Sequence, residues 1–161
     1  MKEKEFKKRI QKNKYQVFFF CSPVGFPFWF AVHAWVVTND NGIIHRWEIS
    51  AFSNSGKKHG KLLYRNATLP WNGIELIKIK GMPRFPSIFI DVISGGKNSL
   101  AHKMVTFIKN TPKTYPYTNT YHLIPGPTSN TYIQWILNHF PKATIKLPWN
   151  AFGKNYRKKG S

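Results

Sequence analysis

Residues 30–49 read FAVHAWVVTNDNGIIHRWEI and contain two apolar segments around a polar turn. β-Branched and aromatic residues dominate both segments, which is typical of strands, and Asn39–Gly42 has strong turn composition. We therefore predict a hairpin with strands over Phe30–Thr38 and Ile43–Ile49. Because hairpins outnumber any strand–helix–strand pattern along the chain, the sequence predicts an α+β fold, an antiparallel sheet packed with a few helices.

Length and composition restrict the classes of protein to consider. The chain has 161 residues, enough for one domain with a sizeable core, and its 42% hydrophobic content excludes a fully disordered protein. The formal charge of +19 means that the surface attracts anions such as nucleic acid, anionic lipid, cell-envelope polymers or a phosphorylated partner. The single cysteine, Cys21, excludes an intrachain disulfide and a multi-cysteine zinc site.

The chain changes character near residue 14, where a basic segment gives way to the apolar run 15–37. Pro23, Gly25 and Pro27 interrupt that run, so we expect a solvated basic arm followed by an apolar loop and a buried strand, in place of a membrane-spanning helix. The expected organisation is an arm over 1–14, a single α+β domain over 15–156 and a basic tail over 157–161. An open alternative places the basic arm on anionic headgroups and the following aromatic segment at a membrane interface.

The remaining elements follow from apolar spacing and turn composition. A strand is predicted over Ile74–Lys80, and Phe89–Ile93 is a short apolar segment closed by Ser94-Gly-Gly96. Loops are predicted where Ser, Gly, Pro, Thr or Lys dominate, over Ser53–His59 and Thr111–Thr120. Helical spacing of apolar residues predicts two helices, over Asn98–Asn110 and Thr131–Phe140.

The hairpin places His33 and Glu48 on one face of the sheet in every register that its turn allows. A loop of Asp40-Asn41, or of Asn39–Gly42, puts the two residues directly opposite, whereas a loop of Asn41-Gly42 puts Glu48 on the diagonal. A carboxylate beside an imidazole fixes the tautomer of the ring and favours its protonated form, as in a catalytic base with its orienting group. The same pair also fits a half-buried histidine satisfied by a cross-strand partner, and this interpretation stays open.

Ser129 is the candidate nucleophile. The segment Gly126–Thr131 runs directly into the second predicted helix, so Ser129 lies at or just before the start of that helix. Free backbone N–H groups and the helix dipole stabilise an anion there, which suits a nucleophile and an oxyanion. The simpler interpretation is that Thr128, Ser129 or Asn130 caps the helix. The sequence contains no phosphate-binding loop, no His-x-x-x-His motif and no usefully spaced carboxylate pair, and we expect no cofactor and no metal.

Several motifs together resemble one family. They are His33-Ala-Trp35, Arg46-Trp-Glu48, Tyr115-Pro116, Tyr121, Pro125-Gly-Pro-Thr-Ser-Asn-Thr-Tyr132 with Trp135, Leu147-Pro148 and Ala151-Phe-Gly-Lys-Asn-Tyr156. Over about residues 30–156 the chain resembles the uncharacterised bacterial family catalogued as domain of unknown function 3750. Thr128 stands where the family pattern has Asn and Asn155 where it has Asp, and neither difference touches the candidate residues. The resemblance implies a bacterial source but no activity.

A remoter resemblance implies a fold and two roles. A strand histidine followed by an Asn- and Ser-rich turn that opens a helix is similar to the circularly permuted papain-like proteins, among them NlpC-type and lecithin–retinol acyltransferase-like proteins. This resemblance implies that His33 is the base and that Ser129 occupies the position of the catalytic cysteine. A serine hydroxyl, unlike a thiol, must lose its proton to a base during attack.

Three functions remain open on this evidence. The first is a hydrolase or acyltransferase for an amide or ester bond, with His33, Ser129 and Glu48 as catalytic residues. The second is an inactive binding module for a peptide, glycan or anionic lipid. The third, a nucleic-acid-binding protein, ranks lowest because no recognised motif is present. The side chains expected to contact a substrate are Trp35, Asn130 and His122, and the sequence leaves the compartment and the oligomeric state open.

Overall fold

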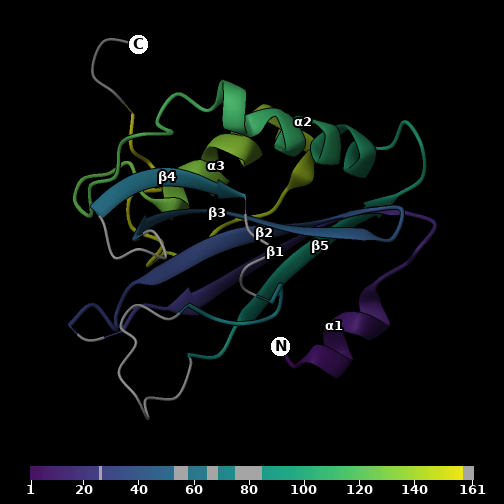
Figure 1. The fold of residues 1–161 in the computed structure, drawn as a ribbon, viewed down its shortest axis with the longest axis horizontal. Helices are drawn as coiled ribbons and strands as arrows, with labels where there is room; N and C mark the ends of the chain where they lie inside the picture. Colours follow the sequence, from purple (N-terminus) through teal and green to yellow (C-terminus); the bar gives the residue numbers. More distant parts are fainter. Residues whose placement is uncertain (26, 53–57, 65–68, 75–84, 158–161) are drawn as a thin grey trace.

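The computed structural model describes residues 1–25, 27–52, 58–64, 69–74 and 85–157. Strands from this part of the chain form one antiparallel five-stranded sheet in the order β4-β3-β2-β1-β5 (Figure 1). The strands are β1 (Tyr15–Pro23), β2 (Val32–Asp40), β3 (Ile43–Phe52), β4 (Lys58–Tyr64) and β5 (Ile88–Gly95). An α+β architecture with an antiparallel sheet is therefore confirmed.

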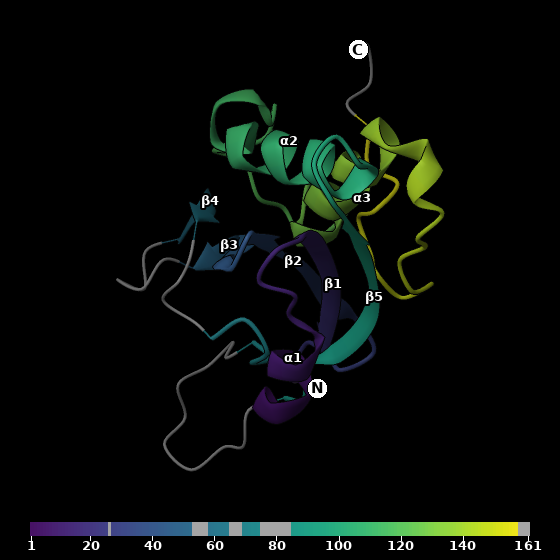
Figure 2. The same cartoon turned by 90° about the vertical axis from the view of Figure 1, so that its right-hand side faces the viewer.

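Helices lie on both faces of the sheet. They are α1 (Glu3–Arg9), α2 (Leu100–Thr114), α3 (Ser129–His139) and the short 3₁₀ helix Pro141–Ala143. Figure 2 shows α2 and α3 together on one side of the sheet and α1 on the other. No helix within the described ranges is both long and apolar enough to cross a membrane.

The β2–β3 hairpin has a two-residue turn, Asn41-Gly42. Both residues have positive φ, 50° and 98°, which Asn and Gly tolerate and which matches the twist of the flanking strands. Asp40 pairs with Ile43, and this register continues to the pair Val36–Trp47. The observed register is thus the one that places Glu48 diagonally from His33.

Strand β2 is buried on both faces, and its alternating side chains enter two separate cores. Val32, Ala34 and Val36 face α2 and α3, where they join a large cluster that includes Met104, Ile108, Ile133 and Ile136. Trp35 and Val37 face the other way and pack with three phenylalanines, Phe6, Phe18 and Phe20. His33 has the same parity as Trp35, so its side chain belongs to the face that α1 covers.

The N-terminal arm differs from the solvated segment expected over 1–14. Residues Glu3–Arg9 form α1, and Phe6 is fully buried against Phe18, with ring centroids 5.1 Å apart. The amino group of Met1 also donates a hydrogen bond to the carbonyl of Ser87. Phe6, with Met1 and Ile10 packed at the edge of the same cluster, docks this helix on the aromatic face of the sheet.

Most predicted elements are present, with three differences at loops. Both predicted helices are confirmed, and the apolar segment Phe89–Ile93 lies within the strand β5. β1 occupies the first part of the apolar run, where a loop was expected, and β4 begins at Lys58, inside the loop predicted over Ser53–His59. Helix α2 continues to Thr114 through Pro112, although a loop was expected from Thr111. Pro112 has no N–H for the carbonyl of Ile108, and the hydroxyl of Thr111 donates to that carbonyl instead, at 2.7 Å. Apart from Ile74, the predicted strand Ile74–Lys80 lies outside the described residues.

Candidate functional site

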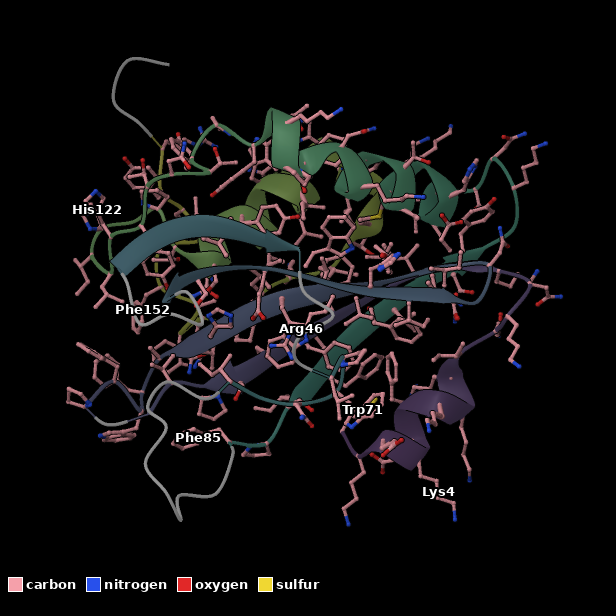
Figure 3. All side chains as sticks on the ribbon, in the orientation of Figure 1. Lys4, Arg46, Trp71, Phe85, His122 and Phe152 are labelled. Carbon is pink, nitrogen blue, oxygen red and sulfur yellow. The ribbon has the colours of Figure 1, made fainter. Side chains whose placement is uncertain are left out.

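A buried charge cluster lies on the α1-facing side of β2 and β3. His33 Nε2 and Glu48 Oε2 are 2.9 Å apart, and Arg46 Nη2 donates to the same carboxylate oxygen at 3.0 Å. The other guanidinium nitrogen, Arg46 Nη1, donates to the carbonyls of Leu69 and Asn72. The guanidinium also stacks on Trp35, with its carbon 4.2 Å from the ring centroid. Figure 3 shows Arg46 in the middle of the sheet. The cluster therefore ties β2, β3 and the segment 69–72 together.

The electrostatics of the cluster keep Glu48 ionised. Burial by itself would raise the pKa of Glu48, but the charges and hydrogen bonds of Arg46 and His33 outweigh burial and lower this pKa to about 2. An ionised carboxylate only accepts hydrogen bonds, so Nε2 of the His33 ring carries a proton. In the neutral ring, Nδ1 is then the nitrogen with a free lone pair, and no hydrogen bond within the described residues occupies it. The pairing expected between His33 and Glu48 is observed, and it leaves Nδ1 as the basic atom.

Asn130, the second residue of α3, fastens the start of this helix to β2. Its Oδ1 accepts a hydrogen bond from the Ala34 N–H at 3.0 Å, and its Nδ2 donates to the carbonyls of Val32 and Phe152, each at 2.8 Å. The two β2 groups flank His33 in the backbone, and they lie beyond the last β2–β3 register pair, Val36–Trp47. The side chain of Asn130 thus occupies a place where β3 no longer pairs with β2.

Ser129 is the first residue of α3, and Thr128 is its N-cap. Ser129 is only 2% exposed, and within the described residues no hydrogen bond joins it to His33. Tyr121 connects the two regions. Burial raises the pKa of the Tyr121 phenol, and the negative charge of Glu48 raises it further. The side chain and backbone of Ser129 act in the opposite direction and lower this pKa. The Tyr121 oxygen therefore lies at the start of α3 and within electrostatic range of Glu48.

The structure places the three residues expected to contact a substrate in different surroundings. Trp35 is fully buried, stacks on Phe20 and donates to the carbonyl of Pro70, so it supports the cluster from within the core. Asn130 is also buried, and both ends of its amide are used by backbone groups. His122 is exposed, and Figure 3 shows it at the periphery of the molecule, at the same end in this view as Phe152. Neither Trp35 nor Asn130 presents a free group to a ligand in this structure.

Sequence reasoning missed two members of the site, Arg46 and Tyr121. Arg46 precedes Glu48 by two residues in a strand, so the period of two already places both on one face, and this signal was available. Tyr121 lies in the irregular segment between α2 and α3, where no periodicity indicates direction. Its role becomes visible only when the position of α3 is known.

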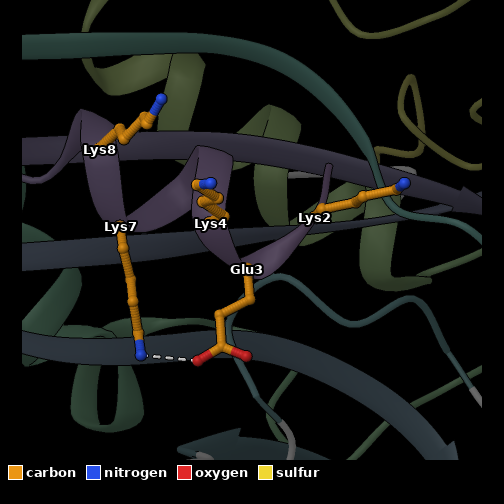
Figure 4. Close-up of a pocket in the computed structure, with 5 residues that line it drawn as sticks. All are labelled: Lys2, Glu3, Lys4, Lys7 and Lys8. Atoms are coloured by element: carbon orange, nitrogen blue, oxygen red, sulfur yellow. Dashed lines mark ion pairs between the residues drawn. The ribbon is translucent and has the colours of Figure 1, made fainter.

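A shallow hollow on α1 lies apart from this cluster. Lys2, Glu3, Lys4, Lys7 and Lys8 line it (Figure 4), and the ion pair between Lys7 Nζ and Glu3 Oε1 spans 2.6 Å. Both partners are largely exposed, which is usual for an (i, i+4) pair on a solvated helix. The hollow contains none of the candidate residues.

Comparison with known proteins identifies the family. A family profile described as "Protein of unknown function (DUF3750)" matches residues 14–156, which include every member of the site described above. Searches of curated proteins and of solved structures found no match. Since the match covers most of the chain, this protein belongs to the DUF3750 family.

Proposed function

We propose that this protein cleaves or transfers an acyl group at an amide or ester bond, with Ser129 as nucleophile, His33 as base and Glu48 as the group that orients His33. The observation that carries the proposal is the 2.9 Å contact between His33 Nε2 and Glu48 Oε2, which leaves Nδ1 as the basic nitrogen. Asn130 supports it by holding the start of α3 against the backbone on both sides of His33. A base, its orienter and a hydroxyl at a helix N-terminus are the components of serine-dependent acyl transfer.

The chemical steps follow from these positions. Ser129 Oγ forms a bond to the carbonyl carbon while its proton passes to His33 Nδ1, and the carbonyl oxygen becomes an oxyanion. The backbone N–H of Ser129, at the positive end of α3, would donate to that oxyanion. Collapse breaks the bond to the leaving amine or alcohol, which takes the proton from His33, and an acyl-serine remains. Attack by water or by an acceptor nucleophile, with His33 again as base, releases the acyl group.

Tyr121 lies beside the proposed nucleophile. The side chain and backbone of Ser129 are close enough to the Tyr121 phenol to oppose the rise in its pKa that burial causes, and a substrate carbonyl would engage the same Ser129 groups. Ser129 is 2% exposed while Tyr121 lies there. We therefore assign the present arrangement to a closed site, which a substrate opens by displacing the phenol. The proposal includes a circularly permuted papain-like fold. The order of the two residues along the chain, a histidine on a strand and then a serine that opens a helix, supports this fold.

A second candidate function is a binding module without catalysis. The burial of Ser129 and the lack of a hydrogen bond to His33 within the described residues favour it. In this case His33, Arg46 and Glu48 stabilise the sheet, and a peptide, glycan or anionic lipid binds without covalent change. The two candidates differ in whether Ser129 reacts.

A fluorophosphonate probe separates the candidates, because it forms a phosphorus–oxygen bond with an activated serine and releases fluoride. Intact-mass and peptide analysis should find the label on Ser129. Ser129→Ala and His33→Ala should each abolish it, and Tyr121→Phe should label at least as fast as the wild type. Ser99→Ala is the matched control, because Ser99 also stands at the start of a helix and accepts from the His102 N–H at 3.2 Å.

Absence of labelling in the folded wild-type protein would reject the catalytic proposal and leave the binding module. Labelling of Ser129 that persists in His33→Ala would reject the assignment of the base.

A further inference from the structure

Five exposed aromatic side chains form a continuous surface, here termed the aromatic rim. Three lie in the β1–β2 connection and two in the C-terminal segment: Phe28, Trp29, Phe30, Trp149 and Phe152. Trp29 is 69% exposed and Trp149 is 81% exposed, whereas Trp35 and Trp47 are buried. Large exposed apolar patches on a folded domain mark interaction surfaces. The rim is therefore a candidate interaction surface.

The rim is continuous because its rings contact one another in series. Phe30 lies 6.4 Å from Phe28, 6.2 Å from Trp29 and 5.9 Å from Phe152, and Phe152 lies 6.5 Å from Trp149, all between ring centroids. The backbone also joins the two segments, since the Val32 N–H donates to the Asn150 carbonyl and Asn150 Nδ2 donates to the Phe30 carbonyl. These bonds hold the exposed rings in place from both sides.

The charge of the surrounding chain indicates an anionic partner. The six acidic residues of the sequence are Glu3, Glu5, Asp40, Glu48, Glu75 and Asp91, so none follows Asp91. The C-terminal part of the chain, which contributes Trp149 and Phe152 to the rim, is basic and includes Lys142, Lys146, Lys154 and Arg157. Exposed apolar rings in segments that contain basic but no acidic residues match a surface with anionic groups above an apolar layer.

We infer that the aromatic rim docks on the interface of an anionic lipid bilayer. Tryptophan and phenylalanine partition into the interfacial region, while nearby lysine and arginine attract the headgroups. Three of the five rings are phenylalanines, which carry no polar group for the hydroxyls of a glycan. Neighbouring rings are steeply inclined, at 70° to 85°, so they offer no shared flat platform for stacked sugars or bases.

Two exposed aliphatic side chains lie in the segment next to the C-terminal one. Leu123 is 55% exposed and Ile124 is 83% exposed. Their segment lies beside the C-terminal one, because the Cα of Gly126 is so close to Tyr156 that an added Cβ would lie 2.9 Å from its side chain. Aliphatic side chains insert among acyl chains but do not stack on bases or sugars, which favours lipid over the other anionic partners. Three rings of the rim, Phe28, Trp29 and Phe30, belong to the aromatic segment that the sequence suggests for a membrane interface, whereas Phe18 and Phe20 of that segment are buried.

Vesicle binding tests this inference directly. The full chain is mixed with vesicles of phosphatidylcholine alone, or of equal parts phosphatidylcholine and phosphatidylglycerol, and bound protein is measured by flotation. We expect binding to the anionic vesicles and a shift of tryptophan emission to shorter wavelength as Trp29 and Trp149 leave water. The double variant Trp29→Ala/Trp149→Ala should bind at least about tenfold more weakly, from the apolar area removed. Ile43→Ala is the control, because Ile43 is also exposed, at 60%, but lies at the turn after β2.

Three results would overturn the inference: no binding to anionic vesicles, equal binding of the double variant and the wild type, or binding that salt abolishes without any change in emission. Preferential binding to a glycan or to nucleic acid, with vesicles failing to compete, would assign the rim to that partner instead. Quenching of the wild-type emission by brominated acyl chains gives an independent answer that requires no variant. A quenched emission supports insertion of the rim, and an unquenched emission of bound protein rejects it.

Discussion

Replacing Glu48 by glutamine keeps the size of the side chain and removes its charge. In the folded protein Glu48 accepts from both His33 and Arg46, and these partners lower its pKa from 4.5 to about 2. Such a difference corresponds to about 3 kcal/mol of stability at neutral pH. The glutamine also leaves the buried Arg46 guanidinium without its counter-charge, so we expect Glu48→Gln to lower the free energy of unfolding by about 3 to 5 kcal/mol.

The stability that Glu48 contributes should decrease as the pH falls. Because the pKa of Glu48 is lower in the folded than in the unfolded state, its contribution is fully present above about pH 5 and disappears as the pH falls towards 2. Urea unfolding at neutral pH and at about pH 3 should therefore show the wild type losing most of its advantage over Glu48→Gln in acid. Asp91→Asn is the control, since Asp91 is an exposed carboxylate on β5, and its difference from the wild type should stay small at both pH values.

Two results would refute the reasoning. A loss below about 1 kcal/mol at neutral pH would mean that the cluster contributes no more than an exposed ion pair. A loss of equal size at neutral and acid pH would mean that Glu48 acts through shape or packing and not through its ionised form.

Three further changes test other parts of the structure. Asn130→Ala removes two buried hydrogen bonds and one partly buried one, and it should lower the free energy of unfolding by about 3 kcal/mol. Asn110→Ala, which loses one exposed bond, should cost less than about 1 kcal/mol in the same urea titration. Phe6→Ala should cost about 3 kcal/mol if α1 is part of the folded unit, while Phe28→Ala, at an exposed position, should cost less than about 0.5 kcal/mol; equal values for the two would contradict the docking of α1. Cys21 should resist a disulfide reagent in the native state and react after unfolding, because burial raises the pKa of its thiol to about 11; rapid native reaction would show that β1 opens locally.

The sheet could be predicted where local chemistry determines it. Asn41-Gly42 predicts its own turn, and alternation in the flanking strands then places His33 and Glu48 on one face. β4 could not be predicted in the same way, because Lys58–Tyr64 lacks a strong apolar alternation and pairs as a strand only against β3. The docking of α1 depends likewise on an aromatic cluster assembled by other strands, which the composition of the arm alone does not reveal.

The site could be predicted only in part, for the same reason. Arg46 and Glu48 share a face by simple alternation, so their proximity was accessible from the sequence. The relation of Ser129 to His33 depends on how α3 meets β2, nearly one hundred residues earlier in the chain, and on where the irregular segment carrying Tyr121 lies. The burial of Trp35 and Asn130 also depends on tertiary packing. Residue type alone predicts neither, because tryptophan and asparagine side chains occur both in cores and on surfaces.

The clamp made by Asn130 has a consequence for local motion. A carboxamide has the same donor and acceptor as a peptide unit, and here it replaces one segment of a neighbouring strand along β2. Withdrawal of α3 would leave the Ala34 amide without its acceptor and open it to deuterium exchange. The exchange rate of that single amide therefore reports how often the helix separates from the sheet, and slower exchange on adding a ligand would reveal occupancy of the site without any knowledge of its chemistry.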